Sequence, residues 1–169
     1  MAKKKSAKEK TPVRKKPKVE MGMSHIAIPR SPRTCVVGEF FSEGGINLFS
    51  YVDADVAKFF GADVKPRAGY ECASYTLSEE MDDESARRLM PGARAMDMAA
   101  IRYLISLQPK GGTGELSGRE GNANCFLMPS GRVEVVWEGK KWGIWAFKGK
   151  LPGHMKWPKG TRFFYRPRA

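Results

Sequence analysis

The sequence predicts a single small α+β domain in which antiparallel β-hairpins pack on one or two helices, preceded by a disordered basic arm. Three observations lead to this prediction. The chain has 169 residues, which suits one domain built around one core. Short β-branched and aromatic runs, separated by turn residues, alternate with helical patterns. The first 20 residues carry too few apolar side chains to build a core.

The arm is the most basic stretch of the chain, with nine Lys or Arg against two Glu in residues 1–20. Two valines are its only sizeable apolar residues after the initiator Met, and two prolines interrupt any helix. Burying so little apolar surface does not offset the entropy lost on ordering. We therefore expect residues 1–20 to be disordered in the free protein.

The next stretch, residues 21–33, is predicted to be a tether, because two prolines favour extended backbone there. The folded domain is expected to cover residues 34–169. Its first elements are a strand at 34–41 and a returning strand at 46–52, with Ser, Glu and two Gly between them. Together these runs predict a hairpin.

The following elements are a short helix, a strand and an acidic helix. Asp53 can cap a helix that runs through Phe60. Residues 70–77 alternate larger and smaller side chains, which indicates a strand. Ser78 is predicted to cap a further helix, because the acidic residues at 79–84 then lie in its first turns, where the helix dipole favours negative charge.

The core helix is expected at 93–107, where apolar residues recur at helical spacing. The glycine-rich stretch at 110–124 is predicted to be a mobile loop. Its first residues, Lys110 to Gly114, superficially suggest a phosphate cradle. However, the lysine precedes the glycines and no Lys-Ser or Lys-Thr pair closes the loop, so a flexible linker is the preferred interpretation.

The C-terminal third is predicted to be mainly β-structure. A Pro-Ser-Gly turn joins strands at 125–128 and 132–137, and a second turn leads into a strand at 141–147. The last strand is expected at 161–165. Alternation along 132–137 places two valines and a tryptophan on one face of the sheet.

The net charge of +12 and the pI of about 9.8 predict a negatively charged partner, RNA or DNA. The charge is segregated along the chain. Residues 1–20 carry +7, residues 21–50 carry 0, residues 51–100 carry −4 and residues 101–169 carry +9, which sums to +12. Lysine-rich arms neutralise phosphates and release counterions, so the arm is the first candidate for nucleic-acid contact.

The predicted nucleic-acid contacts are the basic side chains of the arm, the tether and the C-terminal third, together with one tryptophan. They are Lys3, Lys4, Lys5, Lys8, Lys10, Arg14, Lys15, Lys16, Lys18, Arg30, Arg33, Lys140, Lys141, Lys148, Lys150, Lys156, Trp157, Lys159, Arg162, Arg166 and Arg168. Exposed aromatic rings near cations suit single strands, because bases stack on them. The alternative, which we favour for most of the tryptophans and phenylalanines, is that they build the core. Trp157 is the aromatic residue expected to be exposed.

Other constellations predict no metal, cofactor or catalytic residue. The three cysteines, at positions 35, 72 and 125, are widely spaced and odd in number, which favours buried thiols over a disulfide framework. No Cys or His pair has zinc-ligand spacing. A catalytic pair of Cys and His remains an alternative, since two such residues can lie close together in the fold while far apart in the sequence. The acidic run at 79–84 is better explained by its helix position than by a metal.

The favoured function is therefore that of a non-catalytic, nucleic-acid-binding structural or accessory protein of a virus or phage particle, a packaging apparatus or a ribonucleoprotein. One alternative is a virion or core assembly protein, a homo-oligomer or partner-bound component that acts mainly through protein–protein contacts. A metal-dependent nuclease that uses the clustered carboxylates is a third. No signal-peptide core and no apolar run of 18 residues is evident, so we expect no membrane partner. The expected location is intracellular: the cytoplasm, a virion interior, or the nucleus in a eukaryote.

Overall fold

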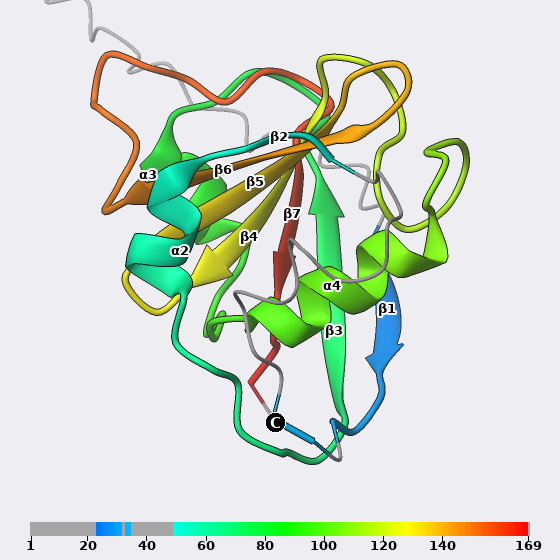
Figure 1. Ribbon diagram of the computed structural model, residues 1–169. Coiled ribbons are helices and arrows are strands. Elements are labelled where there is room, and N and C mark those ends of the chain that lie inside the picture. Colours follow the sequence, from blue (N-terminus) through cyan, green and yellow to red (C-terminus); the bar gives the residue numbers. More distant parts are fainter. Residues whose placement is uncertain (1–22, 32, 35–48, 169) are drawn as a thin grey trace, which may run out of the picture.

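The structure is a computed structural model that describes residues 23–31, 33–34 and 49–168. Within these ranges the protein is mixed α+β, with a seven-stranded sheet and three helices (Figure 1). The basic arm and nearly all of the expected strand at 34–41 lie outside the described residues. The first strand of the hairpin predicted for 34–52 is therefore not tested, and the hairpin stays a prediction.

The seven strands lie in the order β1-β3-β7-β4-β5-β6-β2. Their bounds are β1 Met23–Ile28, β2 Phe49–Val52, β3 Tyr70–Thr76, β4 Ala123–Met128, β5 Gly131–Trp137, β6 Trp142–Lys148 and β7 Arg162–Tyr165. The helices are α2 Ala54–Phe60, α3 Asp83–Arg88 and α4 Met98–Leu107.

The expectation of a simple hairpin domain is wrong. Two of the strand pairs are parallel: β7 beside β4, and β2 beside β6. Parallel neighbours need a crossover connection, which a chain of hairpins does not contain. The last strand of the chain enters the sheet between β3 and β4, and it is antiparallel to β3.

Helices cover both faces of the sheet. Figure 1 shows α4 and α2 in front of the strands and α3 behind them. The larger apolar cluster lies on the α2 and α4 side and includes Phe126 and Phe164, whose rings stack with centroids 4.6 Å apart. Their neighbours Cys125 and Phe163 point to the other face, into the cluster on the α3 side. The alternation of side chains along each strand thus supplies two cores.

Most elements that depend on local sequence are confirmed. The carboxylate of Asp53 caps α2 by accepting the amide of Asp55 at 2.9 Å. The strand expected at 70–77 is β3. The hairpin expected across the Pro-Ser-Gly turn is β4–β5, and it is followed by β6 as predicted. The strand expected at 161–165 is β7.

Two helices start later than expected. Helix α4 begins at Met98 rather than near residue 93, because Asp97 caps it. Before the cap, the backbone of Arg94 bonds to Arg166 and that of Met96 bonds to Leu127 of β4. Helix α3 begins at Asp83, and its cap is Asp82 rather than Ser78. Met81, just before this cap, instead exchanges two backbone hydrogen bonds with Trp157.

Strand β1 was not expected, since residues 23–28 lie in the stretch predicted to be a tether. It pairs with β3 in antiparallel register, with Ile26 opposite Cys72 and Ile28 opposite Tyr70. Both isoleucines are buried in the larger core. The sequence does contain an indication of this strand, because Ile alternates with small or polar residues over a short stretch. The two prolines that follow instead favoured the prediction of a tether.

The glycine-rich stretch after α4 folds back on itself. Buried Gln108 accepts the amide of Leu116 at 2.6 Å and donates to its carbonyl at 3.1 Å. A Cβ on Gly118 would lie 2.4 Å from the carbonyl oxygen of Gly112, so glycine is required for this close approach. The loop is thus a packed element rather than a flexible linker. None of the helices in the described ranges is long and apolar enough to cross a bilayer.

Candidate nucleic-acid interface

Five arginines lie at one end of the sheet, where β1 and β7 finish and β3 begins. They are Arg30, Arg67, Arg94, Arg166 and Arg168, and we call this region the arginine end. It lies toward the bottom of Figure 1, beside the C-terminus. Three of the five were predicted contacts, while Arg67 and Arg94 were not.

Backbone contacts bring these residues together from distant parts of the chain. Arg94 and Arg166 exchange two backbone hydrogen bonds, of 2.8 and 3.0 Å. A Cβ built on Gly92 would lie 3.4 Å from the Cβ of Arg168, so the turn before Arg94 packs against the chain end. A Cβ on Gly69 would similarly lie 3.2 Å from the amide nitrogen of Arg30.

Tyr70 supports two of the guanidinium groups. The guanidinium carbons of Arg67 and Arg166 lie 4.5 and 4.8 Å from the centre of its ring. Its hydroxyl donates to Asp97 at 3.2 Å. Burial, and then the negative charge of Asp97, raise the pKa of Tyr70 well above its ordinary value, so the ring stays neutral. A neutral ring attracts cations through its face, and this fixes where the guanidinium groups lie.

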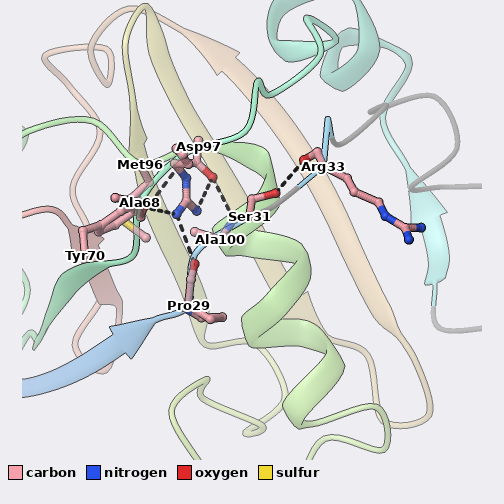
Figure 2. A network of polar contacts seen from close by, with 9 residues as sticks. Pro29, Ser31, Arg33, Ala68, Tyr70, Met96, Asp97 and Ala100 are labelled. Atoms are coloured by element: carbon pink, nitrogen blue, oxygen red, sulfur yellow. Dashed lines mark hydrogen bonds and ion pairs between the residues drawn. The ribbon is translucent and has the colours of Figure 1, made fainter.

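Asp97 is the carboxylate at the centre of the network in Figure 2. Its Oδ2 lies 2.6 Å from Arg67 Nε, and its Oδ1 accepts from Arg67 Nη2 at 3.0 Å. Oδ1 also accepts the amide of Ala100 at 2.9 Å and so caps α4. Arg67 donates further to the carbonyl of Pro29 at 3.2 Å. The charge of Arg67 is therefore already neutralised within the fold.

The charges of Arg94, Arg166 and Arg168, unlike that of Arg67, are not neutralised by a carboxylate among the described residues. All three are exposed, and none forms an ion pair with a carboxylate in the part of the chain that the structure describes. Their positive charge is therefore available to an outside anion. Arg33, another predicted contact, extends away from Asp97 in Figure 2 and does not join them.

Two further predicted contacts, Lys159 and Arg162, lie at the opposite end of the β3–β7 pair. Arg162 Nε donates to the hydroxyl of Thr76 at 2.9 Å, and Arg162 Nη1 donates to the carbonyl of Glu115 in the glycine-rich loop. Together with Arg119, which the sequence reasoning missed, these cations line a hollow of about 660 Å³.

The remaining predicted contacts in the described residues are scattered. Lys140 and Lys141 lie in the turn between β5 and β6, and Lys148 and Lys150 lie at the far end of β6. Lys156 is exposed and forms an ion pair with Glu80 at 3.0 Å. The structure does not bring these lysines to the arginine end. The predicted contacts of the arm lie outside the described residues.

Trp157 contradicts its prediction, because it is buried with 3% of its surface exposed. Its indole nitrogen donates to Asp83 at 3.1 Å, and its ring packs edge-on against Phe163 at 5.0 Å. Asp83 on α3 lies 74 residues away in the sequence, and its contact with Trp157 helps to bury a tryptophan that looks isolated in the sequence. Trp157 offers no face for a base to stack on.

The other aromatic residues of the C-terminal third mainly build the core. Trp137 and Trp142 pack edge-to-face at 5.0 Å inside the larger cluster. This confirms the expected placement of Trp137 with the two valines of β5. Trp145, on the other face, is half-buried and lies 5.6 Å from the exposed ring of Tyr51.

The acidic run that suggested a metal site has partners within the protein. The carboxylate of Asp82 caps α3 by accepting the amide of Ser85 at 2.7 Å. Asp83 accepts from the indole of Trp157 and pairs with Arg87 at 2.7 Å. Glu84 pairs with Arg88. The cap and the two ion pairs stabilise α3 itself, and the contact between Asp83 and Trp157 joins α3 to the rest of the fold.

The two cysteines in the described residues are buried and free. Burial raises the pKa of Cys72 to about 12 and that of Cys125 well above its ordinary value. Thiols of this kind stay protonated at neutral pH and are poor nucleophiles. The side chain of His25 on β1 is exposed, with its Nδ1 3.7 Å from a carboxylate oxygen of Glu71. Cys35 lies outside the described residues.

Arg67 and Arg94 were missed because they lie in the stretch 51–100, whose net charge is −4. A net charge summed over a long stretch does not reveal a single arginine that the fold places beside other cations.

Comparison of the chain with protein-family models, with curated proteins and with solved structures gives no match, so the arrangement of its own residues is the basis for a functional proposal.

Proposed function

We propose that the protein binds RNA or DNA as a non-catalytic structural or accessory protein, and that its folded part contacts phosphates through the arginine end. One observation carries the proposal. Arg94, Arg166 and Arg168 lie together, exposed and without a carboxylate partner among the described residues, beside a ring that orients one of them. Guanidinium groups match phosphate oxygens in charge and in fork geometry.

The arrangement suits contact with the backbone of a nucleic acid rather than with its bases. Arginine contacts to phosphates position a strand and carry no sequence information by themselves. Trp157, the aromatic residue that was expected to stack bases, is in the core. The mechanism we propose is therefore sequence-independent: the arginine end holds phosphates on the folded domain, and the lysine-rich arm adds contacts along the same polymer.

Binding of labelled single-stranded RNA and duplex DNA across a salt series tests this proposal. Replacing Arg94 and Arg168 by Ala in the full-length protein removes two exposed charges and leaves the backbone hydrogen bonds of Arg94 in place. We expect weaker binding and a salt dependence flatter by about 1.4 log units per log unit of salt on single strands, and by about 1.8 on duplex DNA.

The matched control replaces Arg88 and Lys58 by Ala, which removes the same net charge from two exposed cations that pair with Glu84 and Asp55 and are not among the predicted contacts. The control should keep its slope close to that of the unmodified protein. Equal losses for the two double variants would mean that only net charge matters and that the arginine end is no site. If full-length protein binds neither polymer even at low salt, the proposal fails and assembly partners become the leading alternative.

The contribution of the arm is measured separately, by removing residues 1–20. Because nine of these residues are Lys or Arg, we expect their loss to weaken binding and flatten the salt dependence further. Binding by the shortened protein that still depends on Arg94 and Arg168 assigns the remainder to the folded domain. Unchanged binding after removal would exclude a role for the arm.

A further inference from the structure

We infer that the hollow beside the glycine-rich loop binds a phosphate monoester of nucleotide size, either a free mononucleotide or the phosphorylated terminal nucleotide of a strand. The hollow lies where β3 ends and β7 begins, at the opposite end of this strand pair from the arginine end. The inference does not rest on the proposed function, because it uses different residues and a different ligand.

The charge around the hollow selects for an anion. Three cationic side chains line it, from Arg119, Lys159 and Arg162. Among the described residues that line it, none is Asp or Glu. Two acids lie next to lining residues in the sequence. Glu115 accepts a hydrogen bond from the hydroxyl of Ser24 on β1 at 3.2 Å, and the carboxylate of Glu120 lies 3.9 Å from a Cβ built on Gly139, in the turn between β5 and β6. Neither is among the residues that line the hollow.

Arg162 forms a link between the hollow and the fold. Its guanidinium group bonds to Thr76 at the end of β3 and to the carbonyls of Gly114 and Glu115, at 3.3 Å in the case of Gly114. These contacts fix the loop against the strand pair and hold a positive charge at the base of the hollow. A fixed charge binds an anion without the entropy cost of ordering a flexible side chain. Arg162 therefore holds the loop in place and also contributes a positive charge to the lining of the hollow.

The remaining wall is backbone and small polar groups. A Cβ on Gly112 would meet nothing within 4 Å, so the space on that side of its Cα is open, and its φ of +88° favours glycine. The hydroxyls of Thr113 and Ser117 also line the hollow. Hydroxyls and bare backbone next to cations are the groups that bind phosphate oxygens in proteins.

The size of the hollow indicates an ester rather than a bare ion. Its volume of about 660 Å³ falls in the range of about 300–1,000 Å³ typical of sites for small organic ligands. Inorganic phosphate would fill only a small part of it. A second hollow, of about 570 Å³ beside α3, is lined by Asp82, Asp83 and Glu84 as well as by cations, and so has no preference for an anion.

The test is calorimetric titration of the full-length protein with adenosine 5′-monophosphate and with adenosine, which lacks the phosphate. A parallel titration uses one single-stranded oligonucleotide with and without a 5′-phosphate. We expect the monophosphate or the phosphorylated end to bind measurably tighter than its unphosphorylated counterpart. Preference for the free nucleotide or for the strand end identifies the source of the ligand, and either result supports the site.

Lys159→Ala and Lys156→Ala form the matched pair of variants. Both lysines are exposed and lie on the same segment, but only Lys159 lines the hollow. Loss of one charged contact should weaken phosphate binding about tenfold in Lys159→Ala, with Lys156→Ala unchanged. Equal effects of the two changes, or no preference for either phosphorylated ligand, would overturn the inference.

The Arg94 and Arg168 double variant separates this site from the proposed function. It should bind adenosine 5′-monophosphate like the unmodified protein, because both residues lie at the other end of β3. Loss of nucleotide binding in that variant would contradict a separate site. Failure of the protein to bind long nucleic acids, by contrast, leaves the result at the hollow unaffected.

Discussion

The two ends of the β3–β7 strand pair both gather cations, but they hold them in different ways. At the arginine end, Tyr70 supports two guanidinium groups and Asp97 neutralises one of them. At the other end, Arg162 is held by carbonyls and a hydroxyl, and it lines a hollow. The two ends are about 20 Å apart, because the seven residues of β3 span six steps of about 3.4 Å.

This difference indicates two kinds of anion. Exposed arginines around an aromatic ring suit an extended polymer that lies across them, since they contact phosphates without enclosing a ligand. Cations that line a hollow with no carboxylate suit a compact ester. We therefore expect a chain of phosphates to bind across one end of this strand pair and a single phosphate group to bind in the open hollow at the other end.

The largest expected effect on stability comes from replacing Asp97 by Ala, which removes the carboxylate that holds the arginine end together. The change removes the cap of α4, the partner of Tyr70 and the ion pair of a mostly buried Arg67. We expect a loss of about 3 kcal/mol in the free energy of unfolding, measured by urea denaturation. Asp63→Ala, at an exposed position between α2 and β3, is the control and should change stability by less than about 0.5 kcal/mol.

The comparison also requires that Asp97→Ala leave the hollow intact. At temperatures where the variant is folded, adenosine 5′-monophosphate should bind it as it binds the unmodified protein. A stability loss no larger than that of Asp63→Ala would show that the network around Asp97 does not hold the arginine end together.

A smaller effect is expected from Gly114→Ala, which disturbs the hollow end. The new Cβ would lie 2.4 Å from the side-chain carbon of Gln108, whose amide group holds Leu116 from a buried position. We expect a loss of about 1–2 kcal/mol in the free energy of unfolding, together with weaker nucleotide binding. Gly153→Ala is the control, because a Cβ there meets nothing within 4 Å. Reduced binding by Gly114→Ala of long nucleic acids that carry hydroxyl groups at both ends would contradict the separation of the two ends.

The smallest effect concerns α3, which belongs to neither end. The hydrogen bonds that Ser85 donates, from its amide and then from its hydroxyl, hold the pKa of Asp82 below its ordinary value of 3.8. A lowered folded-state pKa stabilises the protein above pH 3.8, and this stabilisation is lost as the pH falls through the folded-state value. Asp82→Ala should therefore be less stable than the unmodified protein at pH 7, by a margin that shrinks toward pH 3.

Urea denaturation at several pH values measures that margin. A difference that stays constant down to pH 3 would show that the carboxylate does not act through its charge. Neither nucleotide binding nor the salt dependence of nucleic-acid binding should change in Asp82→Ala, because Asp82 lies away from both ends of the β3–β7 pair.

Local sequence was sufficient to predict the elements that depend on neighbouring residues. The cap at Asp53, the turn between β4 and β5 and the strand at β7 follow from residue types within a few positions. The mixed α+β class follows from the same patterns. The insertion of β7 between β3 and β4 does not, because strand order depends on contacts between distant parts of the chain.

The candidate sites were predicted only in part, for the same reason. Arg166 and Arg168 are basic residues of a basic segment, so charge alone pointed to them. Arg94 and Arg119 become relevant only when the fold places them beside other cations. Trp157 was misjudged because its partner Asp83 is on a different element.

Mapping of backbone amide resonances by NMR tests the separation of the two ends most directly. Isotopically labelled full-length protein is titrated with adenosine 5′-monophosphate and, separately, with an oligonucleotide that has hydroxyl groups at both ends. We predict that the nucleotide shifts amides of residues 112–119 and 159–162, and that the oligonucleotide shifts amides of residues 92–94 and 166–168. If both ligands shift the same set of amides, or if neither shifts the set assigned to it, the account of two distinct anion sites is wrong.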